Sequence, residues 1–353
     1  MSKDGIYGKT ARYDRDFLVS TENKKYKVTH LGDLCYNPAN LKFGVICLNT
    51  YGDAIFSPIY VTFEIEASFD PDFIGAYLTR WDFINRALKY QQGTVYERMA
   101  VSPEDFVSIK CCFPQRAEQT RLAEFITLLD KRIAAQEKYV ECLKKYKRGV
   151  VRTLLSPKHC SIKNVKWTTS RIGDIGIFIK GAPLSKADIS LEGTPFILYG
   201  ELYTTYSEVI SNVVRKTQAS VDKQYYSQIG DVIIPTSGET PEEISTASCV
   251  MLPDIILAGD LNIYRCTQVD GRIMSYILNH VVNDRIARIA QGKSIVHVQA
   301  AEISKIEITY PDPFSQKTII AILAAISDRI DQSNAELRLL NELRKALLQK
   351  LFI

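Results

Sequence analysis

Residues 122–154 read LAEFITLLDKRIAAQEKYVECLKKYKRGVVRTL, and residues 319–351 read IIAILAAISDRIDQSNAELRLLNELRKALLQKL. The two stretches belong to one internal repeat, because a shift of 197 residues places residues 101–154 on residues 298–351 without a gap. Within it Pro114 falls on Pro311, and Gln119 falls on Gln316. A repeat of this length sets the architecture before any local prediction. Each copy predicts a short strand, a break marked by proline and a long helix.

Apolar residues recur at alternating spacings of four and three in both copies, which predicts two amphipathic helices. Eight of the ten positions in each copy are apolar, and the polar exceptions fall at the same places, Gln136 with Ser333 and Lys147 with Arg344. The seam residues, without Lys147 and Arg344 and without the last positions Leu154 and Leu351, are Leu122, Ile126, Leu129, Ile133, Gln136, Val140, Leu143 and Val150 in the first copy and Ile319, Leu323, Ile326, Ile330, Ser333, Leu337, Leu340 and Leu347 in the second.

The average spacing of 3.5 residues over about five heptads is typical of helices that pack along their length as a coiled coil. A polar residue in such a seam costs least opposite another polar residue, so the matching exceptions predict that the two helices pair with each other. Each helix would be about 60 Å long at 1.5 Å per residue, which suits a rigid spacer.

The segments outside the helices predict two α/β globules. In residues 157–314, β-rich runs at 175–179, 196–199 and 232–234 are punctuated by glycine, proline and serine, and a helical patch is expected near 274–289. Residues 1–115 look like a shorter counterpart, with strands at 54–57 and 60–63 and one helix over 73–89. The repeat leaves some 40 residues of the second globule without a counterpart in the first.

The composition is that of a soluble protein of about two domains, with 46% hydrophobic and 24% charged residues in 353. The sequence has no apolar run of about 18 residues and no apolar N-terminal stretch, so we expect a cytoplasmic protein without a membrane partner. Eight cysteines occur without a C-x-x-C pair and four histidines without an H-x3-5-H pair, which favours reduced thiols over a metal site. A net charge of +4 does not by itself establish a nucleic-acid partner.

Each short motif that suggests catalysis lacks neighbouring residues that the catalytic motif requires. Residues 292–294 (GKS) lack the preceding glycine of a P-loop, since position 287 is alanine. Residues 37–40 (NPAN) lack the second proline and the aromatic residue of an adenine-methyltransferase loop, and residues 22–24 (ENK) lack the acidic partner of a nuclease site. The sequence therefore predicts a binding protein with no catalytic residue, no metal and no cofactor of its own.

Basic and aromatic residues are interleaved in the predicted loops of both globules. Lysine and arginine can neutralise phosphates, and tyrosine can reach phosphates or base edges, although a solvated basic surface accounts for each residue equally well. The candidate DNA-contacting residues are Lys42, Lys89, Tyr96, Arg98, Lys180, Lys186, Tyr199, Tyr203, Arg215, Lys216, Lys223 and Lys293.

The order of these features resembles the specificity (S) subunit of type I restriction-modification enzymes. The junctions at 114–119 (PQRAEQ) and 311–316 (PDPFSQ), and the helix endings at 147–155 (KRGVVRTLL) and 344–352 (RKALLQKLF), are similar to its conserved regions. Residues 167–175 (WTTSRIGDI) followed by Lys180 and Gly181 resemble the opening of a target recognition domain. Residues 31–34 (LGDL), 57–60 (SPIY) and 93–98 (GTVYER) resemble the later part of another.

The resemblance implies an α+β fold in which two long helices form an antiparallel coiled coil between two target recognition globules. The domains would be 1–115, the first recognition domain, which lacks its opening part; 116–156, the central conserved helix; 157–314, the second recognition domain; and 315–353, the distal conserved helix. Each recognition domain would read one half of a two-part target in double-stranded DNA, and the helix pair would set the unread spacer. Two methyltransferase subunits and the restriction and translocase subunits would be the partners, and they would carry the methyl donor, ATP and magnesium.

Two other functions remain open on the sequence alone. An interaction protein could use the same helices for self-association without DNA specificity, which the salt dependence of duplex binding would distinguish. A methyltransferase would bind its cofactor as an isolated chain, and the failed motifs argue against it.

Overall fold

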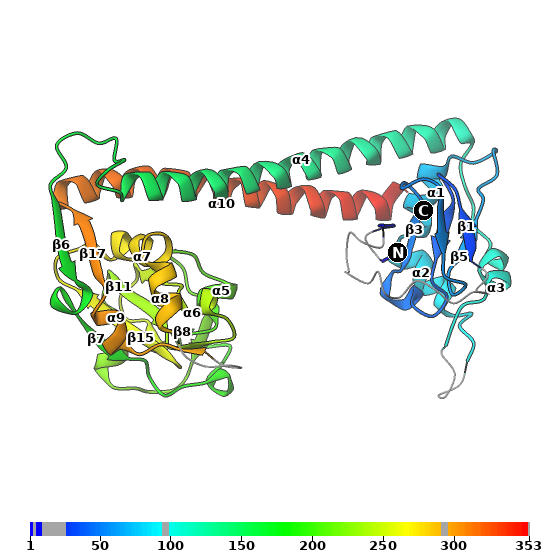
Figure 1. The fold of residues 1–353 in the computed structure, drawn as a ribbon. Coiled ribbons are helices and arrows are strands. Elements are labelled where there is room, and N and C mark those ends of the chain that lie inside the picture. Colours follow the sequence, from blue (N-terminus) through cyan, green and yellow to red (C-terminus); the bar gives the residue numbers. More distant parts are fainter. Residues whose placement is uncertain (3–4, 9–25, 94–98, 291–295, 352–353) are drawn as a thin grey trace. The chain divides into compact units, whose positions relative to one another are not determined.

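The computed structural model describes residues 1–2, 5–8, 26–93, 99–290 and 296–351. The chain divides into two compact units, residues 1–138 with 334–353 (unit 1) and residues 139–333 (unit 2). Helices α4 (Arg116–Leu154) and α10 (Pro313–Leu351) have 39 residues each, and each begins in one unit and ends in the other (Figure 1). The predicted class is confirmed: helices and sheets are mixed, and two long helices accompany two α/β globules.

The described residues of unit 1 form a three-stranded antiparallel sheet in the order β3–β2–β5, a two-stranded sheet of β1 and β4, one 3-10 helix and three short α-helices besides the long helices. The elements are β1 (Lys27–Thr29), β2 (Leu34–Tyr36), the 3-10 helix η3 (Leu41–Phe43), β3 (Ile46–Leu48), β4 (Ala54–Phe56), β5 (Val61–Phe63), α1 (Pro71–Leu78), α2 (Trp81–Leu88) and α3 (Pro103–Ser108). Its core includes the stacked rings of Tyr36 and Phe106, with centroids 4.6 Å apart, and Ile126 from α4. Burial of this apolar surface is the main favourable term in folding.

Unit 2 is built on a five-stranded sheet in the order β7–β15–β11–β13–β9, with a second sheet of β10, β8 and β14. The strands are β6 (Trp167–Arg171), β7 (Gly176–Lys180), β8 (Thr194–Leu198), β9 (Val209–Ile210), β10 (Arg215–Thr217), β11 (Asp231–Pro235), β12 (Ser237–Gly238), β13 (Ser248–Val250), β14 (Ile256–Ala258), β15 (Leu261–Cys266), β16 (Val296–His297) and β17 (Glu307–Pro311). The shorter helices are η4 (Ile172–Asp174), η5 (Lys186–Asp188), α5 (Glu201–Thr204), η6 (Lys223–Tyr225), α6 (Pro241–Ile244), α7 (Gly271–His280), α8 (Asn283–Ile289) and α9 (Ala300–Ser304). Residues of α4 and α10 complete its largest core cluster.

Both units contain the same motif, a glycine and an aspartate at the N-terminal end of the middle strand of the sheet. Gly32 before β2 and Gly230 before β11 have φ values of 92° and 94°, which only glycine adopts without strain. Asp33 Oδ2 accepts a hydrogen bond from the His30 backbone N–H at 2.7 Å, and Asp231 Oδ2 accepts one from the Gln228 N–H at 2.8 Å. The sheet β3–β2–β5 therefore corresponds to β13–β11–β15.

The same glutamine anchors each long helix to its globule. Gln119 Oε1 accepts a hydrogen bond from the Asp70 backbone N–H at 3.0 Å, and Gln316 Oε1 accepts one from the Asp270 N–H at 2.8 Å. The Nε2 of each donates to the carbonyl of the proline five residues earlier at 2.8 Å. The two aspartates cap the N-termini of α1 and α7. Since both glutamines are buried, these bonds fix where each long helix starts.

The prediction of one continuous helix over 73–89 is wrong, and the helical patch expected near 274–289 consists of two helices. The helix expected over 73–89 is interrupted between α1 and α2, where Thr79 donates its hydroxyl to the Gly75 carbonyl at 2.8 Å and Arg80 is extended. The helical patch expected near 274–289 is confirmed by α7 and α8, which are separated at Val281 and Val282. Threonine and valine are weak helix formers, since their branched Cβ restricts χ1.

The strand predicted at the start of the first repeat copy is wrong as well. In the second copy α9 is followed by β17, which pairs with β6. In the first copy α3 occupies the place of α9, and none of the described residues forms a strand with 110–114. A strand requires a hydrogen-bonded neighbour, and the first copy has no counterpart of β6 among the described residues.

The sixteen seam residues are all buried or half-buried, and eight of them, Ile126, Ile133, Gln136, Val140, Ile319, Leu323, Ile330 and Ser333, are fully buried. In unit 1 the guanidinium of Arg344 pairs with Asp130, with Nη2 3.0 Å from Oδ2, and Arg132 lies 2.6 Å from Glu336. These contacts place α4 and α10 antiparallel within unit 1. In unit 2 the Arg329 Nε donates to the Tyr139 hydroxyl at 3.3 Å.

Three of the four polar residues of the seam, Gln136, Lys147 and Arg344, are paired with carboxylates. Gln136 donates to Glu336 at 3.2 Å, and the Lys147 ammonium lies 2.8 Å from Glu208, which also contacts His280 at 2.7 Å. The antiparallel arrangement separates Lys147 from Arg344, which lie in different units. Burial acts to raise the pKa of Glu208, but hydrogen bonds and the Lys147 charge outweigh it and lower the pKa to about 2. Among the described residues, no helix combines the length and the apolar composition needed to cross a bilayer.

Candidate nucleic-acid interface

Four of the candidate lysines lie around the sheet of β10, β8 and β14 in unit 2. Lys180 ends β7, Lys186 belongs to η5, Lys216 belongs to β10 and Lys223 belongs to η6, which contacts both β7 and β14. All four are exposed. Their ammonium groups are therefore available to neutralise phosphates of a nucleic acid.

Arg215 is less available than its neighbour Lys216. Its Nε donates to Glu201 Oε1 at 2.8 Å, and Glu201 is buried and also accepts a hydrogen bond from the Leu198 backbone N–H. Since the carboxylate is fixed to β8, the strand that pairs with β10, the ion pair holds the guanidinium close to the protein surface.

Tyr199 and Tyr203 are half-buried rather than displayed. Both pack against the core cluster that contains Ile197 and Leu257. Burial raises the pKa of the Tyr203 hydroxyl. Their contact with the core is sufficient to account for both rings.

In unit 1 the exposed candidates are Lys42 in η3 and Lys89 at the C-cap of α2. The Lys42 ammonium lies 5.2 Å from the centroid of the Phe43 ring. Three further candidates, Tyr96, Arg98 and Lys293, lie outside the described residues.

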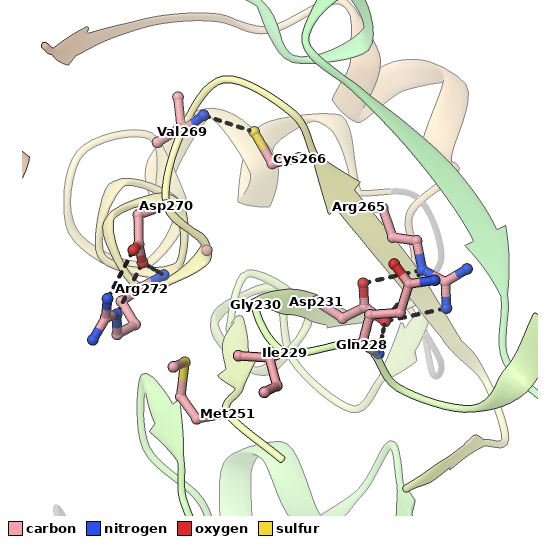
Figure 2. Close-up of a pocket in the computed structure, with 11 residues that line it drawn as sticks. Gln228, Ile229, Gly230, Asp231, Met251, Arg265, Cys266, Val269, Asp270 and Arg272 are labelled. Atoms are coloured by element: carbon pink, nitrogen blue, oxygen red, sulfur yellow. Dashed lines mark hydrogen bonds and ion pairs between the residues drawn. The ribbon is translucent and has the colours of Figure 1, made fainter. Parts of the chain in front are cut away.

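A pocket of about 290 Å³ lies where the loop before β11 meets the N-terminus of α7, and Figure 2 shows its lining. Two arginine–aspartate pairs face it. Arg265 donates to Asp231 at 3.1 Å and to the Tyr226 carbonyl at 2.9 Å, and Arg272 donates to Asp270 at 2.8 Å. Both guanidinium groups are thus engaged within the protein.

The pocket has a structural role that the sequence did not reveal. Burial acts to raise the pKa of Asp270, but the hydrogen bonds from Arg272 outweigh it, so that the pKa is lowered and the carboxylate stays charged. Arg265 ties the segment after η6 to β11 and thereby fixes the position of Lys223. Among residues 1–2, 5–8, 26–93, 99–290 and 296–351, no group of three or more potential metal ligands lies together. The sequence feature that could have identified Arg265 as a structural residue is its place in a strand, β15, whose other residues are mostly apolar.

The NPAN sequence at 37–40 serves a turn. Asn37 is buried, and its side-chain oxygen accepts hydrogen bonds from the backbone N–H groups of Ala39 and Asn40, both at 3.1 Å. The side-chain oxygen of Asn37 is therefore engaged in an Asx turn.

Comparison with known proteins gives a family and a fold. The sequence model of the "Type I restriction modification DNA specificity domain" matches residues 164–342, about half of the chain. No curated protein matches the sequence. The S subunit of a type I restriction-modification system from M. genitalium is similar in structure, with a TM-score of 0.58, 16% identity, and coverage of 93% of this chain and 84% of that one.

A second similar structure comes from work on complex assembly and conformational transition of the type I R-M system, with a TM-score of 0.61 and 17% identity over 94% of this chain and 84% of that one. At these identities the similarity establishes the fold. The family match and the twofold repeat of core and long helix agree, and the chain belongs to the type I restriction-modification DNA specificity family.

Proposed function

We propose that the chain is the non-catalytic specificity subunit of a type I restriction-modification complex and acts in the cytoplasm, with each unit reading one half of a two-part target in double-stranded DNA. The observation that carries the proposal is the double occurrence of one core, with its glycine–aspartate turn, capped helix and glutamine-anchored long helix. The family match disfavours the adaptor without DNA specificity. Methyl donor, ATP and magnesium would belong to the partner subunits.

The long helices carry a second apolar stripe that the seam does not use. We define the outer stripe as Phe125, Leu128, Leu339 and Leu343 in unit 1, and Cys142, Tyr146, Ile322 and Ala325 in unit 2. All eight residues are exposed, with Leu128 at 64% and Leu339 at 65%. Exposed apolar residues at helical spacing are typical of a surface that receives another helix.

The members of the outer stripe lie on one flank of the helix pair. In an antiparallel coiled coil, the residue directly before a seam residue such as Ile133 or Leu337, the a positions of their heptads, faces the equivalent residue of the other helix. Arg132 and Glu336 occupy such positions and are 2.6 Å apart in unit 1. Phe125 and Leu343 occupy the same kind of position one heptad away. The opposite flank carries Ala123 and Leu348, which pack into the core of unit 1.

The outer stripe supports the two methyltransferase subunits that the resemblance to the S subunit implies. The shift of 197 residues places Phe125 and Leu128 on Ile322 and Ala325, and Cys142 and Tyr146 on Leu339 and Leu343. Each unit therefore offers one equivalent docking surface. Two equivalent surfaces fit two copies of one partner, with restriction and translocase subunits completing the complex.

Sequence-selective binding to duplex DNA tests the reading function. The S subunit, co-expressed with the methyltransferase of its own system, is expected to bind target duplexes with an affinity that falls steeply with salt, since lysines release counterions from phosphates. The changes Lys186→Ala and Lys223→Ala should each lower the salt slope by about one unit. Binding that ignores DNA sequence would contradict the proposal.

Native mass spectrometry tests the docking surfaces. We expect Leu128→Glu with Leu339→Glu to remove one methyltransferase copy, and Tyr146→Glu with Ile322→Glu to remove the other. Lys131→Glu changes charge on an exposed face outside the stripe and should retain both copies. Retention of two copies by all variants would rule out the outer stripe as the docking surface.

A further inference from the structure

The turn at residues 190–193, between η5 and β8, is held rigidly against β10. The Ser190 backbone N–H donates to the Lys216 carbonyl at 2.8 Å, and the Ser190 hydroxyl donates to the Glu192 carbonyl. Gly193 has a φ of 119°, and a Cβ there would lie 2.2 Å from the Thr217 carbonyl oxygen. Only glycine allows this close approach, so the turn has a defined shape.

This turn presents Leu191 entirely to solvent. The side chain is 97% exposed, more than any other large hydrophobic residue of the described chain. A leucine at the tip of a fixed turn gains nothing from folding, since it buries no apolar surface within the protein. It is therefore suited to contact another molecule.

The surroundings of Leu191 indicate which molecule. Lys186 lies in η5, ahead of the turn, and Lys216 is bonded directly to the turn; both are exposed. The acidic groups nearby are Asp188, which accepts hydrogen bonds from Ser185 within η5, and Glu192, which is exposed beside Leu191. Lysines on the flanks with an apolar residue and a carboxylate at the tip match DNA, whose phosphates surround a groove floored by base edges.

We infer that the turn at 190–193 reads bases in the major groove and that Leu191 contacts the 5-methyl group of a thymine. This inference rests on the proposed function. The 5-methyl group is the apolar feature of the major groove, and a cytosine N4 amino group beside it can donate to the Glu192 carboxylate. The minor groove offers no methyl group, and its negative potential in A-tracts would repel Glu192.

Replacing thymine by deoxyuridine removes only the methyl group and gives a direct test. The target would first be identified for the S subunit with its methyltransferase, and each thymine of the half-site read by unit 2 would then be replaced in turn. We expect one replacement to weaken binding of the native complex about 3- to 10-fold, the order of effect expected for the burial of one methyl group. The Leu191→Ala complex should bind both duplexes with the same, weakened affinity.

The controls separate this inference from the proposed function. Leu191→Met keeps an apolar side chain and should retain the response to deoxyuridine, and Ile177→Ala removes another exposed apolar residue of unit 2 and should bind as the native complex does. If Leu191→Ala binds every duplex like the native complex, or weakens binding while the response to deoxyuridine persists, the thymine contact is wrong. A loss of methyltransferase from the Leu191→Ala complex would also overturn it, by assigning the turn to a protein interface. Failure of the native complex to bind any duplex selectively would instead refute the proposed function.

Discussion

Gln119 and Gln316 occupy equivalent positions of the internal repeat and make equivalent hydrogen bonds. Each makes two hydrogen bonds, to the N-cap of a globule helix and to a proline carbonyl, and each is almost fully buried. Identity at these two positions was visible in the sequence. Their partners were not, because the contacts of Gln119 with Asp70 and of Gln316 with Asp270 span 49 and 46 residues.

We expect Gln316→Ala to lower the free energy of unfolding of unit 2 by about 1–3 kcal/mol, since it leaves the Asp270 N–H without its buried partner. Urea denaturation measures the change. Gln332→Ala, at an exposed position of α10 in the same unit, is the matched control and should be nearly neutral. Equal effects of the two changes would show that the glutamine does not anchor the helix.

The stability of unit 2 should depend on pH through Glu208. Its pKa in the folded protein is lowered to about 2, so its contribution is complete above its ordinary value of 4.5 and is lost as the pH falls towards 2. The contribution is at most about 3 kcal/mol. Unfolding at pH 7 and at pH 3 should show native protein more stable than Glu208→Gln at pH 7, with the gap narrowing at pH 3. A gap that does not change with pH would contradict the charge cluster around Glu208.

The candidate site could be predicted only in part at this scale. The lysines are exposed as expected, since a charged head group stays in water unless it is paired. Tyr199 and Tyr203 were ambiguous from sequence, because an aromatic ring serves a core as readily as an interface. Leu191 was missed because an isolated leucine in a loop carries no periodic signal.

At the scale of elements, the long helices were the most predictable part of the fold. A spacing of 3.5 residues sustained over about five heptads is compatible with few structures besides paired long helices. The short helices were less predictable, since the break between α1 and α2 depends on a local bond from Thr79. The partners of the polar seam residues were also missed: Lys147 contacts Glu208, which lies outside both long helices.

Seam and outer stripe should respond differently to truncation. We expect Ile133→Ala in unit 1 to cost about 2–5 kcal/mol of stability, because it leaves a cavity in the seam. Leu128→Ala, on the outer stripe of the same unit, should change stability by less than about 0.5 kcal/mol while weakening methyltransferase binding. Thermal unfolding and mass spectrometry of the two variants separate the two roles. A larger loss of stability for Leu128→Ala than for Ile133→Ala would contradict the assignment of Ile133 to the seam and Leu128 to the outer stripe.

At the scale of the whole molecule, the proposed spacer role gives a length prediction. One additional heptad after Lys138, matched by one after Ser333, would keep the seam in register and lengthen each helix by about 10 Å at 1.5 Å per residue. One base pair spans about 3.4 Å along a DNA strand, so the unread spacer of the target should grow by about three base pairs. An unchanged spacer would mean that the helices do not set it.

The central claim is that one chain contains two readers, and mapping of methylated adenines tests it most directly. The S subunit would be co-expressed with the methyltransferase of its own system in a host without other adenine methylation, and the methylated positions of the genome would be sequenced. The account predicts a two-part motif with a spacer of constant length. A motif in one uninterrupted part would contradict it.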